Sequence, residues 1–292
     1  MTIKPQNFEE KLVWYTIIGT YGLYFLGAGL LWVPALAWFL MLYLCKKLWA
    51  QTEDTPIEDK ITIPASTWIW IVSMLIMEVC VIMSHIDLDL GMARIIKTSI
   101  AWARTWALMA LFPLIGCLKI RPQILYRAVC IVCLQSLVFS LVCYLGYRLN
   151  LPDISYVSPV GRISPKIGTE YVYLFTIGDG NEFRLNLFTK FANSLGIVGS
   201  IYFFLASQES DKKLRWIGMI SAVVMVVGSV SRLTTFGLVI VPILTWSLTN
   251  FSWPLQSAAG VVCCLAGMFA PLFIDFIETT WNKGPQRPPQ WR

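Results

Sequence analysis

Between Trp216 and Ile274 the chain runs for 59 residues with a single charged side chain, Arg232. This stretch is long enough to cross a membrane more than once, since one helical crossing takes about 20 residues. A cation at membrane depth is costly and usually has a partner or a function. Small and hydroxyl-bearing residues surround it in 228–237, where they allow a turn and can hydrogen-bond a guanidinium or an anion. We therefore expect an integral membrane protein in which Arg232 is the leading candidate for a functional residue.

The composition of the whole chain predicts several membrane crossings. Of the 292 residues, 57% are hydrophobic and 14% are charged, whereas a soluble domain carries about 25% charged residues. The apolar runs are too long for the segments of about 10 residues that build a membrane β-barrel. The start, 1–11, is polar, and the apolar run that follows is longer than a signal-peptide core of about 7–15 residues. That run is therefore expected to be a retained membrane anchor.

Runs with few or no charges predict an all-α, polytopic bundle of about nine membrane spans. The first run, 12–45, is long for one helix and short for two. Its glycines and Pro34 favour a tight hairpin of two spans, and a single span is the alternative. The remaining predicted spans are 66–84, 98–118, 126–147, 187–206, 216–231, 233–248 and 255–277.

Basic residues predict the orientation of these spans. Lys46–Lys47, the cluster at 119–127 and the cluster at 212–215 are spaced two spans apart and therefore lie on one side. The positive-inside rule makes that side cytoplasmic, together with the N-terminus. The opposite side carries about as many basic residues, and we expect some of them to bind something anionic.

The longest internal loop, 148–186, has strand signals of its own. The strand-like run 171–176 is followed by Gly-Asp-Gly-Asn at 178–181, which is typical of a hairpin turn. Residues 182–185 would form the returning strand. A small β-hairpin is therefore expected on the external side of the membrane.

Two arginines stand where predicted spans open toward the external side. Arg184 shortly precedes the sixth span, and Arg232 lies at the turn of the next hairpin. Because the planar guanidinium matches phosphate oxygens, the two would converge on one pyrophosphate; the alternative is that each snorkels alone to the interface. Lys190 and Ser231 are further candidate ligands. Asn193 would hydrogen-bond a sugar or cap its helix.

Other chemistry-bearing residues are expected to have structural roles. Glu78 and Arg104, inside neighbouring spans, would form a buried ion pair, with a proton or ion relay as the alternative. His85, the only histidine, lies at the end of a span, where a polar interface role is favoured over that of a base or metal ligand. Cys130 and Cys133 are expected to be helix-packing residues. The sequence indicates no metal, no cofactor and no nucleic-acid partner.

Two segments resemble a known family. The run 182–196 is similar to the "R…lF…pNslG" segment of bacterial O-antigen ligases and related polysaccharide polymerases, and 228–232 is similar to their "tgSRg" segment. The likeness covers mainly 182–277. It implies a GT-C-like membrane glycosyltransferase that takes a glycan from an undecaprenyl-pyrophosphate carrier at the external face of the bacterial plasma membrane. Lipid A-core, another repeat or a protein would be the acceptor, and no nucleotide sugar or metal would be needed.

By this resemblance, Arg184 and Arg232 would steady the pyrophosphate leaving group as negative charge develops. In the family an external loop after the ninth span carries a further arginine and the catalytic histidine. This chain stops where that loop would begin, so we expect a truncated homologue with no catalytic residue of its own, inactive alone. Residues 1–277 would form the transmembrane domain and 278–292 a disordered external remnant of the loop. The alternatives are a transporter or flippase-type protein without glycosyl transfer, and a partner subunit whose missing half is a separate polypeptide.

Overall fold

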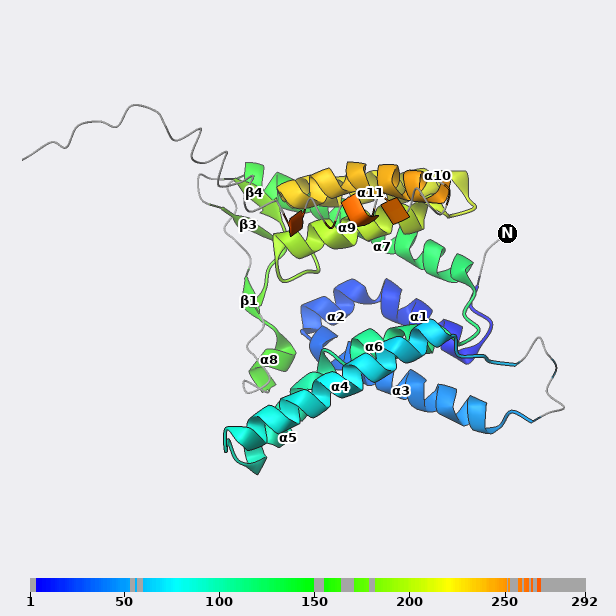
Figure 1. The fold of residues 1–292 in the computed structure, drawn as a ribbon. Helices are drawn as coiled ribbons and strands as arrows, with labels where there is room; N and C mark the ends of the chain where they lie inside the picture. The colour runs from blue at the N-terminus through cyan, green and yellow to red at the C-terminus, as the bar shows by residue number, and fades with distance from the viewer. Residues whose placement is uncertain are drawn as a thin grey trace, which may run out of the picture. The chain divides into compact units, whose positions relative to one another are not determined.

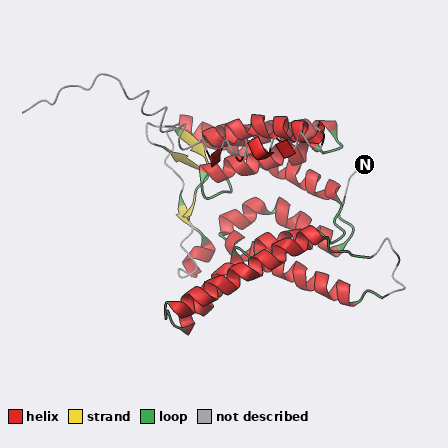
Figure 2. Ribbon diagram, in the orientation of Figure 1, coloured by secondary structure: helices red, strands yellow, loops and turns green. Residues whose placement is uncertain are grey.

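The computed structural model describes residues 4–52, 56, 60–149, 155–163, 171–178 and 182–250, together with scattered positions from 252 to 268. These residues are mostly helical, with a few short strands (Figure 1 and Figure 2). The helices are α1 (Phe8–Ile18), α2 (Thr20–Leu26), α3 (Gly29–Trp49), α4 (Ala65–Asp87), α5 (Met92–Arg104), α6 (Leu108–Ile115), α7 (Pro122–Arg148), α8 (Pro159–Ile163), α9 (Ala192–Ser207), α10 (Lys212–Gly228) and α11 (Arg232–Asn250). Two compact units, 1–235 and 236–292, divide the chain within α11.

Four helical segments among the described residues are long and apolar enough to cross a membrane: Gly29–Trp49, Ala65–Asp87, Met92–Ile115 and Pro122–Arg148. The prediction of a mostly helical chain is confirmed, and these four segments are candidate membrane spans by their length and composition. The apolar helices 192–207 and 232–247 are shorter, and the predicted ninth span, 255–277, lies mostly outside the described residues. The count of nine spans and the GT-C-like arrangement stay predictions.

The first apolar run folds back on itself. Gly19 separates α1 from α2, and α2 ends at Gly27, whose φ of 70° lies in the left-handed region that glycine adopts without strain. α3 then returns alongside α1, where Trp32 Nε1 donates to Thr16 Oγ1. The predicted reversal within 12–45 is confirmed, although only its second arm, α3, is long enough to be a candidate span.

α3, α4, α5 and α6 form one packed group. Its buried core comes from α3, from α6 and from Leu118, three residues after α6: Ala37, Leu40, Leu44, Leu111, Ile115 and Leu118. The fourth predicted span, 98–118, differs from the structure in two ways. The first helix, α5, begins earlier, at Met92. The helix is then interrupted between Arg104 and Leu108, where α6 begins.

α7, α9 and α10 pack side by side (Figure 1). Glycines permit the close approach, since a Cβ at Gly199 would lie 3.0 Å from Val226 Cγ2 and one at Gly218 would lie 2.9 Å from Cys130 Sγ. Cys130 and Cys133 are fully buried. Cys130 therefore has the helix-packing role predicted for it, and Cys133 lies in an apolar cluster with Val129 of α7 and Ala222 of α10.

Short strands occupy part of the chain between α7 and α9. They are β1 (Tyr156–Val157), β2 (Tyr171–Val172), β3 (Phe175–Ile177) and β4 (Phe183–Leu185). β3 and β4 form the predicted antiparallel hairpin, with Thr176 opposite Arg184. Its turn residues, 179–181, lie outside the described residues. The run 171–176 is not one strand, because β2 pairs with β1 instead.

Buried carboxylates form ion pairs with residues of the basic clusters at one end of the helices. The ion pairs are Lys47–Glu9 at 2.6 Å, Arg121–Glu10 at 2.8 Å and Arg127–Glu209 at 2.9 Å. Because Glu9 and Glu10 are neighbours, the clusters at Lys47 and Arg121 meet at the same end. The third cluster, 212–215, begins three residues after Glu209. The structure therefore brings the three clusters together, and their cytoplasmic location stays a prediction.

Candidate anion-binding site

The β3–β4 hairpin lies at the opposite end of α7 from these ion pairs. The Phe183 ring is 5.0 Å from the Tyr147 ring in the last turn of α7, whereas Arg121 directly precedes the first turn. A helix of 27 residues is about 40 Å long, which exceeds the thickness of a bilayer's hydrocarbon core. The hairpin therefore belongs to the end for which the sequence predicts the external side.

Arg184 is positioned by this hairpin. Its guanidinium lies against the backbone of Gly178, where a Cβ would be 2.9 Å from Nε and 3.0 Å from Cζ. Nη2 donates to the Glu182 carboxylate at 2.9 Å, with the two side chains 42% and 54% exposed. Nε has no hydrogen-bond partner among the described residues. An exposed ion pair of this kind contributes about 0–1 kcal/mol, so another anion can replace Glu182 at little cost.

The segment with Arg184 is anchored on the segment that leads to Arg232. Leu185, next in β4, is buried and packs on Gly228, the last residue of α10. A Cβ at Gly228 would lie 3.1 Å from Leu185 Cγ and still closer to one of its methyl groups. Any larger residue at this position would have to displace the buried Leu185 side chain.

The first turns of α9 and α11 also touch. Gly196 faces the end of α10, where a Cβ would lie 2.7 Å from Ser229 Oγ and 2.8 Å from Thr234 Cβ. Its contact with Thr234 Oγ1 would be shorter still. The segments 182–196 and 228–232, which carry the family resemblance, are therefore packed against each other in the fold.

A hydrogen-bonded turn fixes the position of Arg232. The Ser229 hydroxyl, almost fully buried, donates to the Val226 carbonyl at 2.7 Å and accepts from the Ser231 N–H at 3.4 Å. The Ser231 carbonyl in turn accepts the Thr234 hydroxyl at 3.0 Å. Val230, between them, has a φ of 53°, an uncommon conformation for a β-branched residue. The turn ends at Arg232, the first residue of α11.

Arg232 itself is exposed, and no carboxylate among the described residues pairs with it. It lies at the N-terminus of α11, beside the first turn of α9. Helix N-termini carry unpaired N–H groups and a partial positive charge, so they favour anions. Arg232 and the first turns of α9 and α11 therefore belong to one packed region, and both helix ends carry positive potential there.

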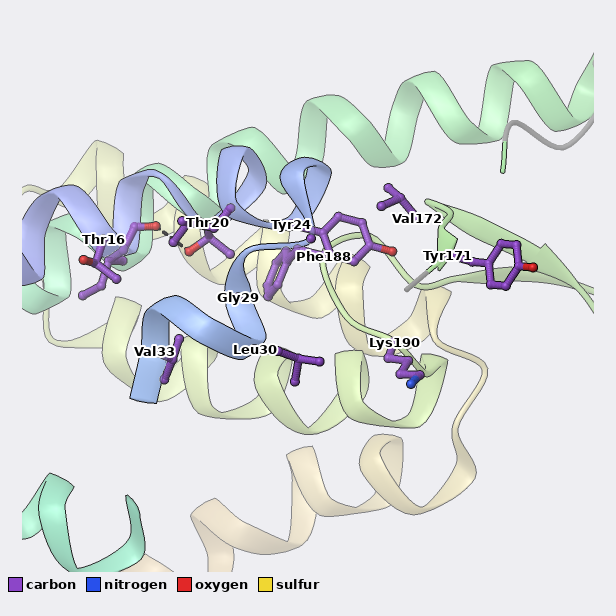
Figure 3. Close-up of a pocket in the computed structure, with 13 residues that line it drawn as sticks. Thr16, Thr20, Tyr24, Gly29, Leu30, Val33, Tyr171, Val172, Phe188 and Lys190 are labelled. Carbon is purple, nitrogen blue, oxygen red and sulfur yellow. Dashed lines mark hydrogen bonds between the residues drawn. The ribbon is translucent and has the colours of Figure 1, made fainter. Parts of the chain in front are cut away.

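Lys190 and Asn193 lie at the start of α9. The Lys190 ammonium stands 6.0 Å from the centroid of the Phe191 ring and lines a cavity that Figure 3 shows. Asn193 is exposed in the first turn. The predicted capping role for Asn193 is wrong, because Phe191 holds the N-cap position and no side chain caps the helix. The amide of Asn193 is therefore accessible to a ligand.

Sequence reasoning identified the charged residues but not the residues that position them. Leu185, Gly196 and Thr234 bring the two segments together, and Gly178 supports the guanidinium of Arg184. A glycine inside a helical pattern was the available signal, since it often marks the close approach of another element.

The other predicted residues lie away from this site. Glu78 and Arg104 do not form the expected ion pair: Glu78 Oε2 and Arg104 Nε are both buried without a partner, and no ion pair between the two is present in the described chain. The His85 ring bridges α4 and α5, with Nδ1 2.7 Å from the Val81 carbonyl and Nε2 3.1 Å from Thr98 Oγ1. A structural role for His85 is supported. No metal-ligand cluster occurs within the described ranges.

Comparison with known proteins found no matching family model, no matching curated protein and no matching solved structure.

Proposed function

We propose that this chain is a polytopic membrane protein of the O-antigen ligase and polymerase type, which binds an undecaprenyl-pyrophosphate-linked glycan at the external end of its helices. The packing of 182–196 against 228–232 carries this proposal, because it brings two separately predicted cationic segments into one structural unit. Two arginines and two helix N-termini suit a diphosphate, which bears charge on several oxygens.

The roles of the site residues follow from their positions. Arg184 and Arg232 would hydrogen-bond the diphosphate oxygens, with Lys190 adding a third cation. The Ser231 hydroxyl and the exposed Asn193 amide would contact the diphosphate or the first sugar. In the transfer reaction the acceptor oxygen would bond to the anomeric carbon of the sugar, and the bond from that carbon to the diphosphate would break. The electron pair stays on the diphosphate, whose developing negative charge these cations would stabilise.

None of the described residues is proposed as the base that activates the acceptor hydroxyl. A transferase of this type needs a base to accept the proton of the acceptor hydroxyl, on lipid A-core or another glycan. Both ring nitrogens of His85, the chain's only histidine, contact oxygen atoms of α4 and α5. The proposal for the described residues is therefore capture of the lipid-linked glycan in the bacterial plasma membrane, with the N-terminus cytoplasmic.

Binding of an undecaprenyl-pyrophosphate-linked oligosaccharide to the protein in nanodiscs tests the proposal. Each lost charge-assisted hydrogen bond is worth about 1.5–3 kcal/mol, so Arg232→Ala and Arg184→Ala should each weaken binding roughly ten- to a hundredfold. Glu182→Gln should strengthen it, since it removes the carboxylate that competes for Arg184. Arg94→Ala on α5 is the matched control for an exposed arginine.

Unchanged affinity in Arg232→Ala and Arg184→Ala, with both variants folded like Arg94→Ala, would reject the site. An equal loss in all three arginine variants would indicate only a general attraction of cations for an anionic lipid, and would reject it as well.

A further inference from the structure

A cavity of about 330 Å³ opens beside the proposed diphosphate site. It lies between the α2–α3 turn, the start of α3, β2 and the segment before α9 (Figure 3). Figure 3 shows Thr16 and Thr20 toward one end and Tyr171 and Lys190 toward the other. Lys190 therefore belongs both to this cavity and to the proposed anion site.

A second hollow, of about 480 Å³, continues along the outer side of α1 and α2. It shares Thr16 and Leu23 with the first cavity, so the two adjoin. Lys11 lines it near the start of α1. Gly22 leaves its floor open, since a Cβ there would meet nothing within 4 Å. Together the two hollows form one groove, the α1–α2 groove, with a lysine toward each end.

The walls of the groove are mostly apolar, and three of their polar side chains are already hydrogen-bonded within the protein. The Thr20 hydroxyl donates to the Ile17 carbonyl at 2.6 Å, and Thr16 Oγ1 accepts from Trp32 Nε1 at 3.1 Å. The Tyr24 hydroxyl donates to the Tyr173 carbonyl at 2.7 Å. A sugar would find few free polar groups along these walls, whereas a hydrocarbon chain leaves the hydrogen bonds of Thr16, Thr20 and Tyr24 intact.

The length of the groove selects among hydrocarbon chains. α1 and α2 span 19 residues from Phe8 to Leu26, or about 28 Å of helix. The hydrocarbon core of a bilayer is about 30 Å thick, so an ordinary lipid of one leaflet reaches only half of this length. One chain that fills the groove must be longer than a leaflet.

We propose that the α1–α2 groove holds the polyisoprenoid chain of the lipid diphosphate, with its headgroup between Lys190 and Arg232. This inference rests on the proposed function and identifies the part of the ligand that the arginines do not contact. The anionic head complements Lys190, and the chain runs along Gly22 toward Lys11. Surrounding lipid also offers an apolar environment, so the preference for a long chain comes from packing along the groove.

Gly22→Leu tests the groove, because it places a side chain in open space and improves helix propensity. Gly237→Leu on α11 is the matched control, since a Cβ at Gly237 also meets nothing within 4 Å. Radiolabelled undecaprenyl diphosphate binding in nanodiscs would be competed with farnesyl diphosphate, which has the same head on a short chain, and with dipalmitoyl phosphatidic acid. Thermal unfolding of both variants checks their fold.

The expected result is a preference of roughly tenfold or more for undecaprenyl over farnesyl diphosphate. Gly22→Leu should remove this preference and Gly237→Leu should keep it. Equal affinity for both diphosphates, full competition by phosphatidic acid, or identical behaviour of the two leucine variants would each overturn the proposal. Arg232→Ala separates the two ideas: it should weaken both diphosphates equally and leave their ratio intact. If it changes neither affinity, the head site fails independently of the chain-length result.

Discussion

Gly196→Ala directly tests the packing between the two cationic segments. The added Cβ would lie 2.7 Å from Ser229 Oγ and 2.8 Å from Thr234 Cβ, while carbon atoms in good contact are about 3.5–4.0 Å apart. Both neighbours are buried, so neither can move into open space. Overpacking of this kind costs about 1–3 kcal/mol.

The higher helix propensity of alanine has the opposite effect on the unfolding free energy, so its contribution must be separated from that of the clash. Glycine inside a helix is about 1 kcal/mol less favourable than alanine, so the substitution alone is stabilising. Gly237→Ala on α11 has the same gain in helix propensity without a clash, because a Cβ there meets nothing within 4 Å. The difference in unfolding free energy between the two variants should therefore equal the clash alone, about 1–3 kcal/mol.

Denaturant unfolding in detergent micelles, followed by tryptophan fluorescence, measures this difference. We expect Gly196→Ala to be the less stable variant and to bind the lipid-linked glycan more weakly, because the first turns of α9 and α11 are forced apart. If Gly196→Ala is as stable as Gly237→Ala, the contact between these turns is absent and the proposed site loses its basis.

Two further predictions concern the turn before α11 and the opposite end of the helices. Val230→Gly should be neutral or about 1 kcal/mol stabilising, since a left-handed residue costs about 1–2 kcal/mol and glycine avoids most of it; Val227→Gly, an exposed control inside α10, should be destabilising in the same unfolding assay. Hydrogen bonds from Arg121 lower the pKa of Glu10 from 4.5 to about 2. This pair therefore contributes stability above pH 4.5 that is lost as pH falls toward 2, and Glu10→Gln should flatten the stability profile across that window. An unaltered profile in Glu10→Gln would contradict the assignment, with Glu182→Gln as a control at an exposed pair.

The elements that sequence predicted best are those with a local chemical cause. The reversal in 12–45 follows from its glycines, and the β3–β4 hairpin follows from the turn residues at 178–181. The start of the sixth span was placed too early, at 187. Leu187 instead has a φ of 49°, and the Thr189 hydroxyl donates to the Asn186 carbonyl, so α9 begins only at Ala192.

The failures arise where tertiary contacts decide. The helix is interrupted between Arg104 and Leu108, where the sequence has no glycine or proline. The proline that predicts a kink, Pro113, lies farther on, inside α6. Likewise, two opposite charges in neighbouring spans predicted a pair between Glu78 and Arg104. Helix rotation and tilt determine whether such side chains meet, and apolar runs do not specify either quantity.

The two ends of α7 differ in how their cations are neutralised, and this difference bears on function. At the end that begins with Arg121, the buried carboxylates Glu9, Glu10 and Glu209 each hold a basic residue. At the other end, Arg184 pairs only with an exposed carboxylate, and Arg232 has no carboxylate partner among the described residues. The sequence predicts this side to be external, where the positive-inside rule does not explain a positive charge. The proposed anionic ligand would account for both the charge and the lack of a buried carboxylate partner among the described residues.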